Sequence, residues 1–343
     1  MPEIEVVVVG AAGARAQAML EIVGRAGTAE GWLAVDRHWR GSERHACERL
    51  GMRTVELDLL EHPQRLRDLI DGAALVVNLA GPAHRTGPAV LDACIEGGCD
   101  YMDICEDPDA TVALLARDAA CRAAGVRALI GMGATPGLPN VLARAGVEWL
   151  GGADEINVSW IVDVADVDQA TLEQGWRLFA PIEGDGRRGA VPAWEELALR
   201  SAEFPAPFGE RLVVALACPW QITVPRFLGI ETVRSYGSIV PEESLVLNWA
   251  LARLGAADEA VELRLGGPPV GVPPLATELY ERYLAGRVPA GHLGSGLVVD
   301  VWSGEEGVRF ASVDPGRLAE SAAAPLAAGI ALMLEGGPGE PGL

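Results

Sequence analysis

Two glycines and an alanine stand three residues apart where a run of four valines ends. Gly10, Gly13 and Ala16 form the pattern Gly-x-x-Gly-x-x-Ala, and neither glycine nor proline occurs in the ten residues from Ala14 onward. Small residues at this spacing are typical of a strand-to-helix turn that binds a pyrophosphate, although helix packing alone also favours them. The N–H groups and the positive dipole end at such a helix start attract phosphate. We therefore predict a dinucleotide site contacted by the backbone of Gly10, Ala12, Gly13 and Ala14.

A carboxylate, Asp36, ends the next apolar run, "WLAVD", at about the twenty-residue distance typical of dinucleotide-binding folds. At that position a carboxylate accepts hydrogen bonds from the adenosine ribose and disfavours a 2′-phosphate. Arg37 and Arg40 follow, and either guanidinium could instead neutralise such a phosphate. The sequence therefore predicts NAD or NADP as cofactor, favours NAD, and makes Arg37 a further candidate contact. Asp58, which ends the third apolar run, is a candidate adenine-side contact or an ordinary turn carboxylate.

Three titratable side chains follow predicted strands and could manage a proton: His84, Asp103 and Glu106. In an open parallel sheet, ligands bind beyond the carboxyl ends of the strands. Hydride transfer needs the nicotinamide held against the substrate carbon and one group that handles a proton. These three residues are the candidate catalytic groups, and a solvated histidine, a helix-capping aspartate and a surface glutamate are the alternatives. Cys218 could be a reactive thiol, although a buried and inert one is favoured.

Two arginines are candidates for binding a substrate carboxylate, because a guanidinium holds a carboxylate through two parallel hydrogen bonds. Arg226, in "TVPRFLG", is the stronger candidate, and Arg177, in "QGWRLF", is the weaker one. An exposed arginine at a helix start is the alternative for Arg226. Three tryptophans could line an apolar pocket, although core packing is favoured for each: Trp160, Trp176 and Trp220.

The composition excludes several classes of function. The chain has 343 residues and a net charge of −21, from 48 acidic and 27 basic residues. Such a surface repels phosphate backbones and anionic lipids, so we expect a small-molecule substrate and neither a nucleic-acid nor a membrane partner. Every basic residue is arginine, which excludes lysine Schiff bases and the P-loop lysine.

The sequence also indicates the compartment. No apolar run reaches the roughly 18–20 residues needed to span a membrane, and the N-terminus lacks a secretory signal. The six cysteines form no Cys-x-x-Cys pair and match no common zinc spacing. We expect a cytoplasmic protein with buried, reduced thiols and no metal site.

Residues 1–150 alternate apolar runs with helical segments. Apolar runs without alternation are typical of parallel strands buried on both faces. This pattern predicts an α/β fold with a Rossmann-type doubly wound parallel sheet. The expected strands are 4–10, 32–36, 54–58, 74–81, 100–104 and 126–132, and the expected helices lie near 14–27, 43–51, 62–71, 86–97 and 109–124.

The pattern changes after residue 150. Residues 151–317 predict a second, α+β domain with a mainly antiparallel sheet, because long strands are separated by Gly/Pro turns. An alanine-rich helix is expected at 318–335, and disorder over 337–343. The expected strands of the second domain are 155–164, 211–217, 232–239, 260–267, 297–304 and 308–313, with a helix near 169–179.

The segment "VVNLAGPAHRTGPAVLDACIEGGCDYMDICED" resembles the saccharopine dehydrogenase-like oxidoreductases, a group that includes saccharopine reductase and lysine 6-dehydrogenase. "GMGATPGLPNVLAR", "TVPRFLGIETVR" and the closing alanine-rich segment resemble further parts of this family in the same order. The residues that carry the resemblance are Asn78, Gly81, Pro82, Glu96, Gly98, Tyr101, Asp103, Pro136, Gly137, Asn140, Thr223, Pro225 and Arg226.

The resemblance implies a Rossmann domain, a smaller mixed domain, a nicotinamide cofactor and usually a homodimer, with the closing helix packed near the first domain. The resemblance also implies that the loops after the fourth and sixth strands contact the cofactor and that Asn140 contacts the substrate. The loop residues concerned are Asn78, Gly81, Pro82, Thr135 and Pro136.

The expected activity is an NAD(P)-dependent interconversion of an amine and an imine, or the reductive coupling of an amino acid to a carbonyl compound. The chain departs from the family before Thr223, where it has the apolar "CPWQI" in place of a His or Glu. That departure motivates one alternative, reduction of a C=C or C=O bond in a lipid-like or polyketide substrate. A non-catalytic dinucleotide-binding protein is the other alternative.

Overall fold

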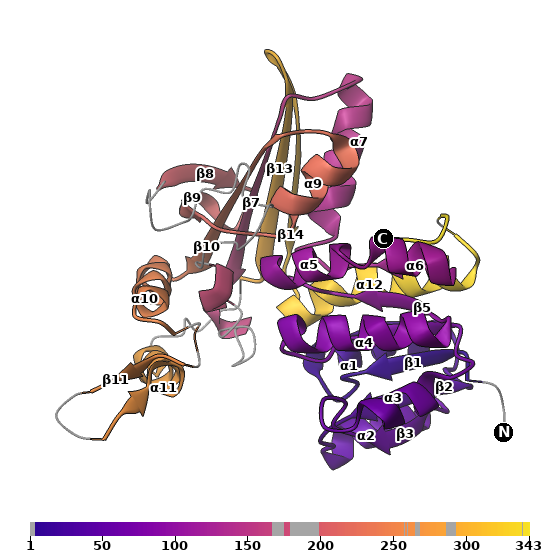
Figure 1. Ribbon diagram of the computed structural model, residues 1–343. Helices are drawn as coiled ribbons and strands as arrows, with labels where there is room; N and C mark the ends of the chain where they lie inside the picture. The colour runs from indigo at the N-terminus through magenta and orange to yellow at the C-terminus, as the bar shows by residue number, and fades with distance from the viewer. Residues whose placement is uncertain are drawn as a thin grey trace. The chain divides into compact units, whose positions relative to one another are not determined.

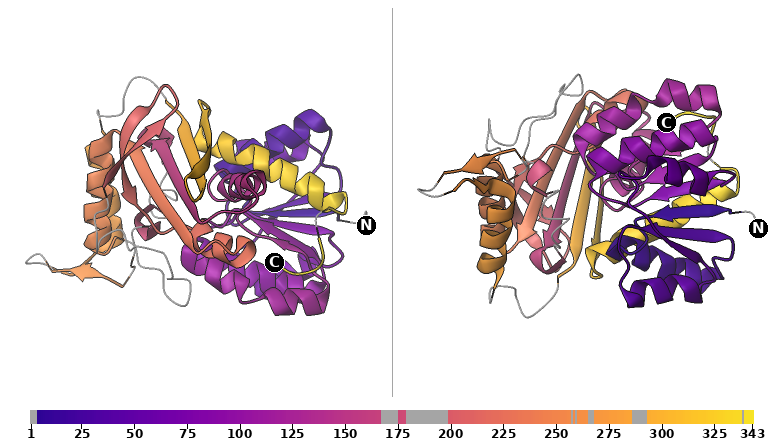
Figure 2. Two further views of the ribbon diagram at one scale, coloured as in Figure 1. Left: turned by 90° about the horizontal axis from the view of Figure 1, so that it is seen from above. Right: turned by 60° about the horizontal axis from the view of Figure 1, so that its bottom comes forward.

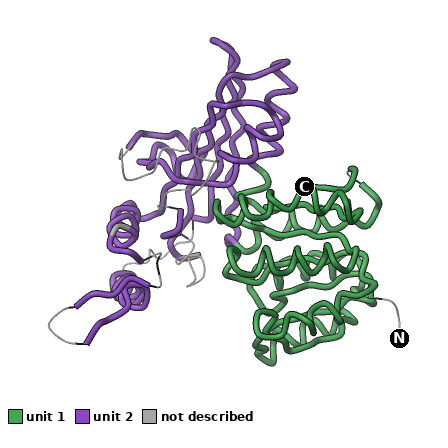
Figure 3. Tube along the Cα trace, in the orientation of Figure 1, with its two compact units in different colours: residues 1–138, 319–343 green, residues 139–318 purple. Residues whose placement is uncertain are grey.

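The chain forms two compact units, residues 1–138 with 319–343 and residues 139–318 (Figure 3). The boundary lies before the expected residue 150 because α7 (Leu138–Leu150) packs on the sheet of the second unit. A Cβ added to Gly146 of this helix would lie only 2.5 Å from Val301 and 3.2 Å from Phe310. The computed structural model describes residues 4–166, 175–178, 199–256, 258, 260–264, 268–285, 293–337 and 339–343.

Among the described residues, the sheet of the first unit has six parallel strands in the order β3-β2-β1-β4-β5-β6. This order is that of a doubly wound dinucleotide-binding sheet, and it reverses between β1 and β4. The predicted Rossmann-type fold is confirmed. The strands are β1 (Val6–Val9), β2 (Trp32–Asp36), β3 (Arg53–Glu56), β4 (Leu75–Asn78), β5 (Asp100–Asp103) and β6 (Ala128–Leu129).

Helices cover both faces of this sheet, which explains why its strands read as unbroken apolar runs (Figures 1 and 2). All four valines of β1 are at most 1% exposed, because alternate side chains enter two separate cores. One face is covered by α3 (Pro63–Ile70), α4 (Ala83–Gly97), α5 (Pro108–Leu115) and α6 (Asp118–Ala124), and the other by α1 (Ala14–Ala26), α2 (Gly41–Arg49) and α12 (Leu318–Leu334).

The single helix expected at 109–124 is two helices, α5 and α6, separated at Ala116 and Arg117. The Arg117 guanidinium donates two hydrogen bonds to the carboxylate of Asp92 on α4, at 2.6 and 2.8 Å. It donates a third to the carbonyl of Ala113 at 2.7 Å. The turn therefore docks the end of α5 on α4 before the chain continues into α6.

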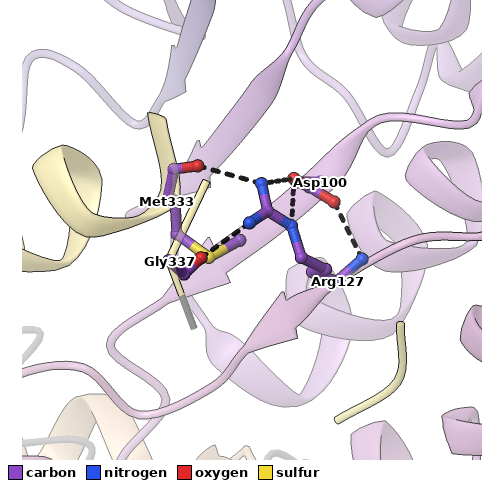
Figure 4. Close-up of polar contacts among 4 residues, drawn as sticks. All are labelled: Asp100, Arg127, Met333 and Gly337. Carbon is purple, nitrogen blue, oxygen red and sulfur yellow. Dashed lines mark hydrogen bonds and ion pairs between the residues drawn. The ribbon is translucent and has the colours of Figure 1, made fainter. Parts of the chain in front are cut away.

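An arginine at the start of β6 fastens the C-terminal segment to the first unit (Figure 4). The Arg127 guanidinium donates to the carbonyls of Met333 at 2.9 Å and Gly337 at 2.6 Å, and to the carboxylate of Asp100 at 2.5 and 2.9 Å. Beyond it, Gly342 pairs with the backbone beside β6 through its N–H and its carbonyl. The expectation that 337–343 is disordered is therefore wrong for the described residues of this tail, because backbone pairing holds them.

Among the described residues, the second unit contains a six-stranded sheet in the order β14-β13-β7-β10-β9-β8. Only the β7–β10 pair is parallel among its described pairs, which confirms the predicted mainly antiparallel sheet. Strand β8 was not expected, since its charged and small residues lack an apolar run. The strands are β7 (Glu155–Asp163), β8 (Arg200–Phe204), β9 (Gly209–Ala215), β10 (Thr232–Val240), β13 (Ser295–Ser303) and β14 (Glu306–Asp314).

The remaining elements of the second unit are short or helical. Within the described residues of the strand expected at 260–267, only Glu262–Leu263 form a strand, β11, which pairs with β12 (Val270–Gly271). The helix expected near 169–179 lies outside the described residues except for 175–178, which are helical. In the described part of the chain, no helix has the length and apolar character needed to cross a membrane. The other elements are the 3-10 turn Val164–Asp166, α9 (Trp220–Leu228), α10 (Glu242–Arg253) and α11 (Val272–Leu284).

Candidate functional site

The turn between β1 and α1 depends on Gly10 for two reasons. Its φ angle is +80°, a conformation that side chains with a Cβ rarely adopt. A Cβ at this position would also lie 2.5 Å from the backbone nitrogen of Ala80 and 2.6 Å from the carbonyl carbon of Leu79. Gly10 therefore lets the turn press against the end of β4, at the point where the strand order reverses.

The second glycine leaves space at the start of α1. Gly13 has ordinary extended angles, and the nearest atom to an added Cβ would be the carbonyl oxygen of Gly10 at 3.2 Å. As the N-cap residue, Gly13 has no side chain to accept hydrogen bonds from the first turn. The side chain of Gln17 donates to the carbonyl of Ala11 at 2.7 Å and so fixes the turn from within the helix. The helix start thus presents an uncapped N-terminus, which suits an anionic group.

Asp36 lies at the end of β2 and contacts this turn directly. Its carboxylate accepts hydrogen bonds from the N–H of Ala12 at 2.9 Å and from the N–H of His38 at 3.1 Å. The two oxygens are thereby held in a fixed direction beside the glycine turn. Arg37 and Arg40 are both exposed on the loop that follows.

Asp58 occupies a turn after β3. Its Oδ1 accepts hydrogen bonds from the N–H of Leu60 at 2.9 Å and of Glu61 at 3.2 Å. These contacts are those of an ordinary turn carboxylate, and its predicted role in binding adenine remains a prediction.

A buried chain of hydrogen bonds joins the carboxyl ends of β4 and β5. The amide of Asn78 donates to the hydroxyl of Tyr101 at 3.2 Å, and this hydroxyl donates to Oδ2 of Asp103 at 2.7 Å. This hydrogen-bond network also reaches the loop after β4, because Oδ1 of Asn78 accepts a hydrogen bond from the N–H of Ala80 at 3.2 Å. All three side chains are at most 4% exposed.

Asp103 extends this chain to β6. Its Oδ1 accepts hydrogen bonds from the N–H of Cys105 at 2.9 Å and from the N–H of Gly131 at 2.7 Å. Burial raises the pKa of this carboxyl, while the hydrogen bonds from Gly131, Cys105 and Tyr101 lower it in part. The carboxylate thus has three donors: it joins the loops after β5 and β6 directly, and the loop after β4 through Tyr101 and Asn78. Such an arrangement positions backbone. The predicted catalytic role of Asp103 remains a prediction.

The other two candidate catalytic groups lie nearer the surface. Glu106 forms an ion pair with Arg15 of α1 at 3.4 Å, and both side chains are about one quarter exposed, at 29% and 25%. His84 is half-buried in the first turn of α4, close in sequence to the exposed Gly81 and Pro82. The structure therefore places Glu106 beside the helix that starts at the glycine turn.

The loop after β6 is a compact backbone structure. The N–H of Gly133 donates to the carbonyl of Pro136 at 3.0 Å, and Pro136 is buried while Thr135 is half-buried. A Cβ on Gly131 would lie 3.0 Å from Pro136, and the φ of Gly131 is +67°. The loop therefore has a fixed shape next to the N–H that Asp103 binds.

The second unit joins two of the residues that carry the family resemblance. The amide of Asn140, on α7, donates to the hydroxyl of Thr223, on α9, at 2.7 Å. Arg226 is exposed on α9, with its guanidinium 5.6 Å from the ring of Phe227. Arg177 is half-buried. Substrate-binding roles for Asn140, Arg226 and Arg177 remain predictions.

The apolar "CPWQI" segment is part of the core. Cys218 is 2% exposed and Trp220 is 1% exposed, and Gln221 accepts a hydrogen bond from the N–H of Cys218 at 2.8 Å. Trp176 is also buried, with its indole donating to Asn248 at 2.9 Å. The apolar character of this segment therefore serves packing.

Sequence reasoning missed Arg15 and Gln17, and named Tyr101 only as part of a family motif. Polar residues in the first helical turn after a glycine pair could have pointed to Arg15 and Gln17. No signal in the sequence showed that Tyr101 lies between Asn78 and Asp103. Over the described residues, no cluster of three or more His, Cys, Asp or Glu side chains could hold a metal ion.

Residues 6–129 match the family described as the saccharopine dehydrogenase NADP binding domain. A short segment of 47 residues is 40% identical to a probable mitochondrial saccharopine dehydrogenase-like oxidoreductase of Arabidopsis thaliana. That segment covers 14% of this chain and 10% of the length of the plant protein.

Solved structures share the architecture of nearly the whole chain. A saccharopine dehydrogenase (L-Glu forming) from Saccharomyces cerevisiae has a TM-score of 0.61 at 13% identity, covering 99% of this chain and 93% of its own. A homospermidine synthase from Legionella pneumophila, in complex with NAD, has a TM-score of 0.57 at 10% identity, covering 98% and 85%. A probable dehydrogenase from Thermotoga maritima has a TM-score of 0.51 at 10% identity, covering 97% and 90%. At such identities the likeness concerns the fold.

Proposed function

We propose that the chain, whose residues 6–129 match the saccharopine dehydrogenase NADP binding domain, binds a nicotinamide dinucleotide and interconverts an amine and an imine by hydride transfer. Reductive coupling of an amino acid to a carbonyl compound belongs to the same class of reaction. The cofactor supplies or accepts the hydride, and the protein binds it, orients it and manages one proton.

The observation that carries the proposal is the geometry of the β1–α1 turn. Gly10 is pressed against the end of β4, Gly13 leaves the start of α1 uncapped, and Asp36 is fixed beside the turn. In open α/β sheets, ligands bind in the crevice where the strand order reverses, which here lies between β1 and β4. The first turn of α1 would hold the pyrophosphate through backbone N–H groups, which suits a chain without lysine.

We propose NAD rather than NADP as the preferred cofactor. Hydrogen bonds from Ala12 and His38 hold the carboxylate of Asp36 in place, so its negative charge would lie where a 2′-phosphate has to fit. The exposed Arg37 and Arg40 could bind such a phosphate only at the cost of that repulsion. One structural relative, the homospermidine synthase from Legionella pneumophila, was solved in complex with NAD, whereas the family that residues 6–129 match is described as NADP binding, so the preference rests on Asp36.

The buried carboxylate of Asp103 would act by holding the loops after β4, β5 and β6 in fixed relation. Proton transfer would then fall to a more accessible group, for which Glu106 and His84 are the candidates. Glu106 is the stronger of the two, because its partner Arg15 belongs to the helix that would bind the pyrophosphate.

Neither alternative function gains support. The "CPWQI" segment that motivated a C=C or C=O reductase is buried core, so its apolar character is accounted for by packing. A non-catalytic dinucleotide-binding protein remains the competing proposal, and a turnover measurement separates the two. We also propose a homodimer, which light scattering of the purified protein would test.

The first experiment is a thermal shift titration with NAD, NADH, NADP and NADPH. A ligand that binds only the folded protein raises its melting temperature by mass action. The second is a spectrophotometric assay of nicotinamide oxidation or reduction, with a panel of amines, amino acids and carbonyl compounds and the best cofactor. A shift with no turnover on any amine or amino acid would refute the reaction, and no shift with any of the four would refute the cofactor site as well.

A further inference from the structure

A positive charge stands at the start of the helix that would bind the dinucleotide. Arg15 is the second residue of α1, and the first turn of this helix contains no acidic residue. The dipole of a helix favours negative charge at its N-terminus, so a guanidinium at this position is electrostatically unfavourable by itself. The same guanidinium is well placed if an anion binds there, because arginine donates several hydrogen bonds to phosphate oxygens.

The ion pair that Arg15 forms with Glu106 is a weak one. Nη2 of Arg15 lies 3.4 Å from Oε1 of Glu106, and both side chains are partly exposed. By contrast, Arg117 in the same unit binds Asp92 through two hydrogen bonds of 2.6 and 2.8 Å. An ion pair accessible to solvent shifts an equilibrium by about fivefold or less. A more strongly charged partner can therefore displace the carboxylate of Glu106 from this guanidinium.

The same ion pair crosses the place where a dinucleotide would bind. The strand order puts β4 between β1 and β5, and α1 begins just after β1. A contact from the first turn of α1 to the loop after β5 therefore passes over the carboxyl end of β4. The backbone of Leu79 and Ala80 lies there, directly against Gly10. Ligands of open parallel sheets bind where the strand order reverses, so a bound pyrophosphate would lie next to Arg15.

The glutamate is the fixed partner of this pair, because hydrogen bonds hold the backbone on both sides of it. The N–H of Cys105 donates to the carboxylate of Asp103 at 2.9 Å. On the other side, the buried Asp107 caps α5 and accepts a hydrogen bond from the N–H of Ala110 at 2.9 Å. Arginine, on the other hand, has a long side chain with several rotatable bonds. A change of partner would therefore move the guanidinium and leave the loop after β5 in place.

We propose that Arg15 exchanges the carboxylate of Glu106 for the pyrophosphate when a dinucleotide binds. The guanidinium then adds its hydrogen bonds to those of the backbone N–H groups in the first turn of α1. The carboxylate of Glu106 loses its cation beside the bound cofactor, and a carboxylate without a cation accepts a proton more readily. The exchange thus couples cofactor binding to the candidate proton acceptor. This inference rests on the proposed dinucleotide site and adds Arg15 to it as a binding residue.

The test is calorimetric titration of the full chain with ADP-ribose, which has the pyrophosphate but no nicotinamide. Arg15→Gln should weaken binding by about tenfold or more, because hydrogen bonds between charged groups are lost, and Arg15→Lys should bind more tightly than Arg15→Gln. Glu106→Gln should strengthen binding by about two- to fivefold, because the guanidinium no longer has to leave a carboxylate. In the Arg15→Gln background, Glu106→Gln should have no effect, because no pair remains to be broken.

The matched control is another ion pair of the first unit, between Arg67 of α3 and Glu96 of α4 at 2.9 Å. Glu96 lies in the last turn of α4, just before β5 begins and so at the amino ends of the strands, and Arg67→Gln should leave the affinity unchanged. Unchanged affinity in Arg15→Gln would overturn the exchange. Equal strengthening by Glu106→Gln with and without Arg15 would also overturn it, because the carboxylate would then act by direct repulsion. A wild-type protein that binds neither ADP-ribose nor NAD would overturn the dinucleotide site itself.

Discussion

Removing the hydroxyl of Tyr101 should destabilise the protein, and more so at neutral than at acidic pH. In Tyr101→Phe, Oδ2 of Asp103 loses its donor at 2.7 Å and the amide of Asn78 loses its acceptor at 3.2 Å. A hydrogen bond to a charged group contributes about 1.5–3 kcal/mol, and a buried amide left unpaired adds about 1 kcal/mol. We therefore expect a loss of roughly 2–4 kcal/mol near pH 8, or roughly 5–15 °C in the melting temperature.

The pH dependence follows from the carboxyl of Asp103. Burial raises its pKa above the ordinary value of 3.8, so the folded protein retains a proton that the unfolded chain has released. The stability that this group contributes is fully present below the ordinary pKa and is lost as pH rises through the raised, folded pKa. The Tyr101 hydroxyl lowers that folded pKa, so its removal raises the pKa further and costs most where Asp103 is ionised.

The assay is thermal unfolding of wild type and Tyr101→Phe at about pH 4.5 and about pH 8. Tyr280→Phe is the matched control, because Tyr280 is also buried and accepts a hydrogen bond from Asn248 at 2.9 Å, and no carboxylate among the described residues bonds to its hydroxyl. The loss in the control should be the same at both pH values. A loss in Tyr101→Phe that does not change with pH, or that is larger at acidic pH, would refute the reasoning.

Three further predictions concern single residues. Gly10→Ala should lower the free energy of unfolding by at least about 2 kcal/mol and weaken nicotinamide binding, because Gly10 has a positive φ and lies against the backbone that follows β4. The control Gly27→Ala, which has open space around it, should change neither the melting temperature nor the affinity measured by titration. Asp36→Ala should weaken NAD more than NADP in paired titrations, and equal weakening would contradict the role given to Asp36. Arg127→Gln removes charged hydrogen bonds to the carbonyls of Met333 and Gly337, so amide hydrogen exchange over 318–343 should become about tenfold faster or more, while exchange in β1 stays unchanged. Unchanged exchange in α12 would show that packing alone holds this helix.

Much of the first unit follows from local sequence. Four consecutive valines can satisfy both faces of a strand only if helices cover both sides, so β1 indicated a strand buried on both faces. The alternation of such runs with helical segments over residues 1–150 then predicted the doubly wound sheet. Gly10 and Asp36 were predicted from spacing, because the turn and the next strand end lie at a fixed distance along the chain in this fold. The second sheet was predicted less completely, since β8 is a short strand with alternating polar residues and no apolar run.

Contacts between distant segments were decided only by the tertiary structure. From the sequence alone, Asp103 could be either a catalytic base or a structural group. In the structure, its partners include the backbone N–H groups of Cys105 and Gly131. Every residue except proline carries a backbone N–H, so no pattern of side chains predicts which N–H groups will bind this carboxylate. The same holds for the carbonyls of Met333 and Gly337 that Arg127 binds from far along the chain. Local spacing specifies which elements form, whereas the burial and pairing of a polar group depend on which elements meet.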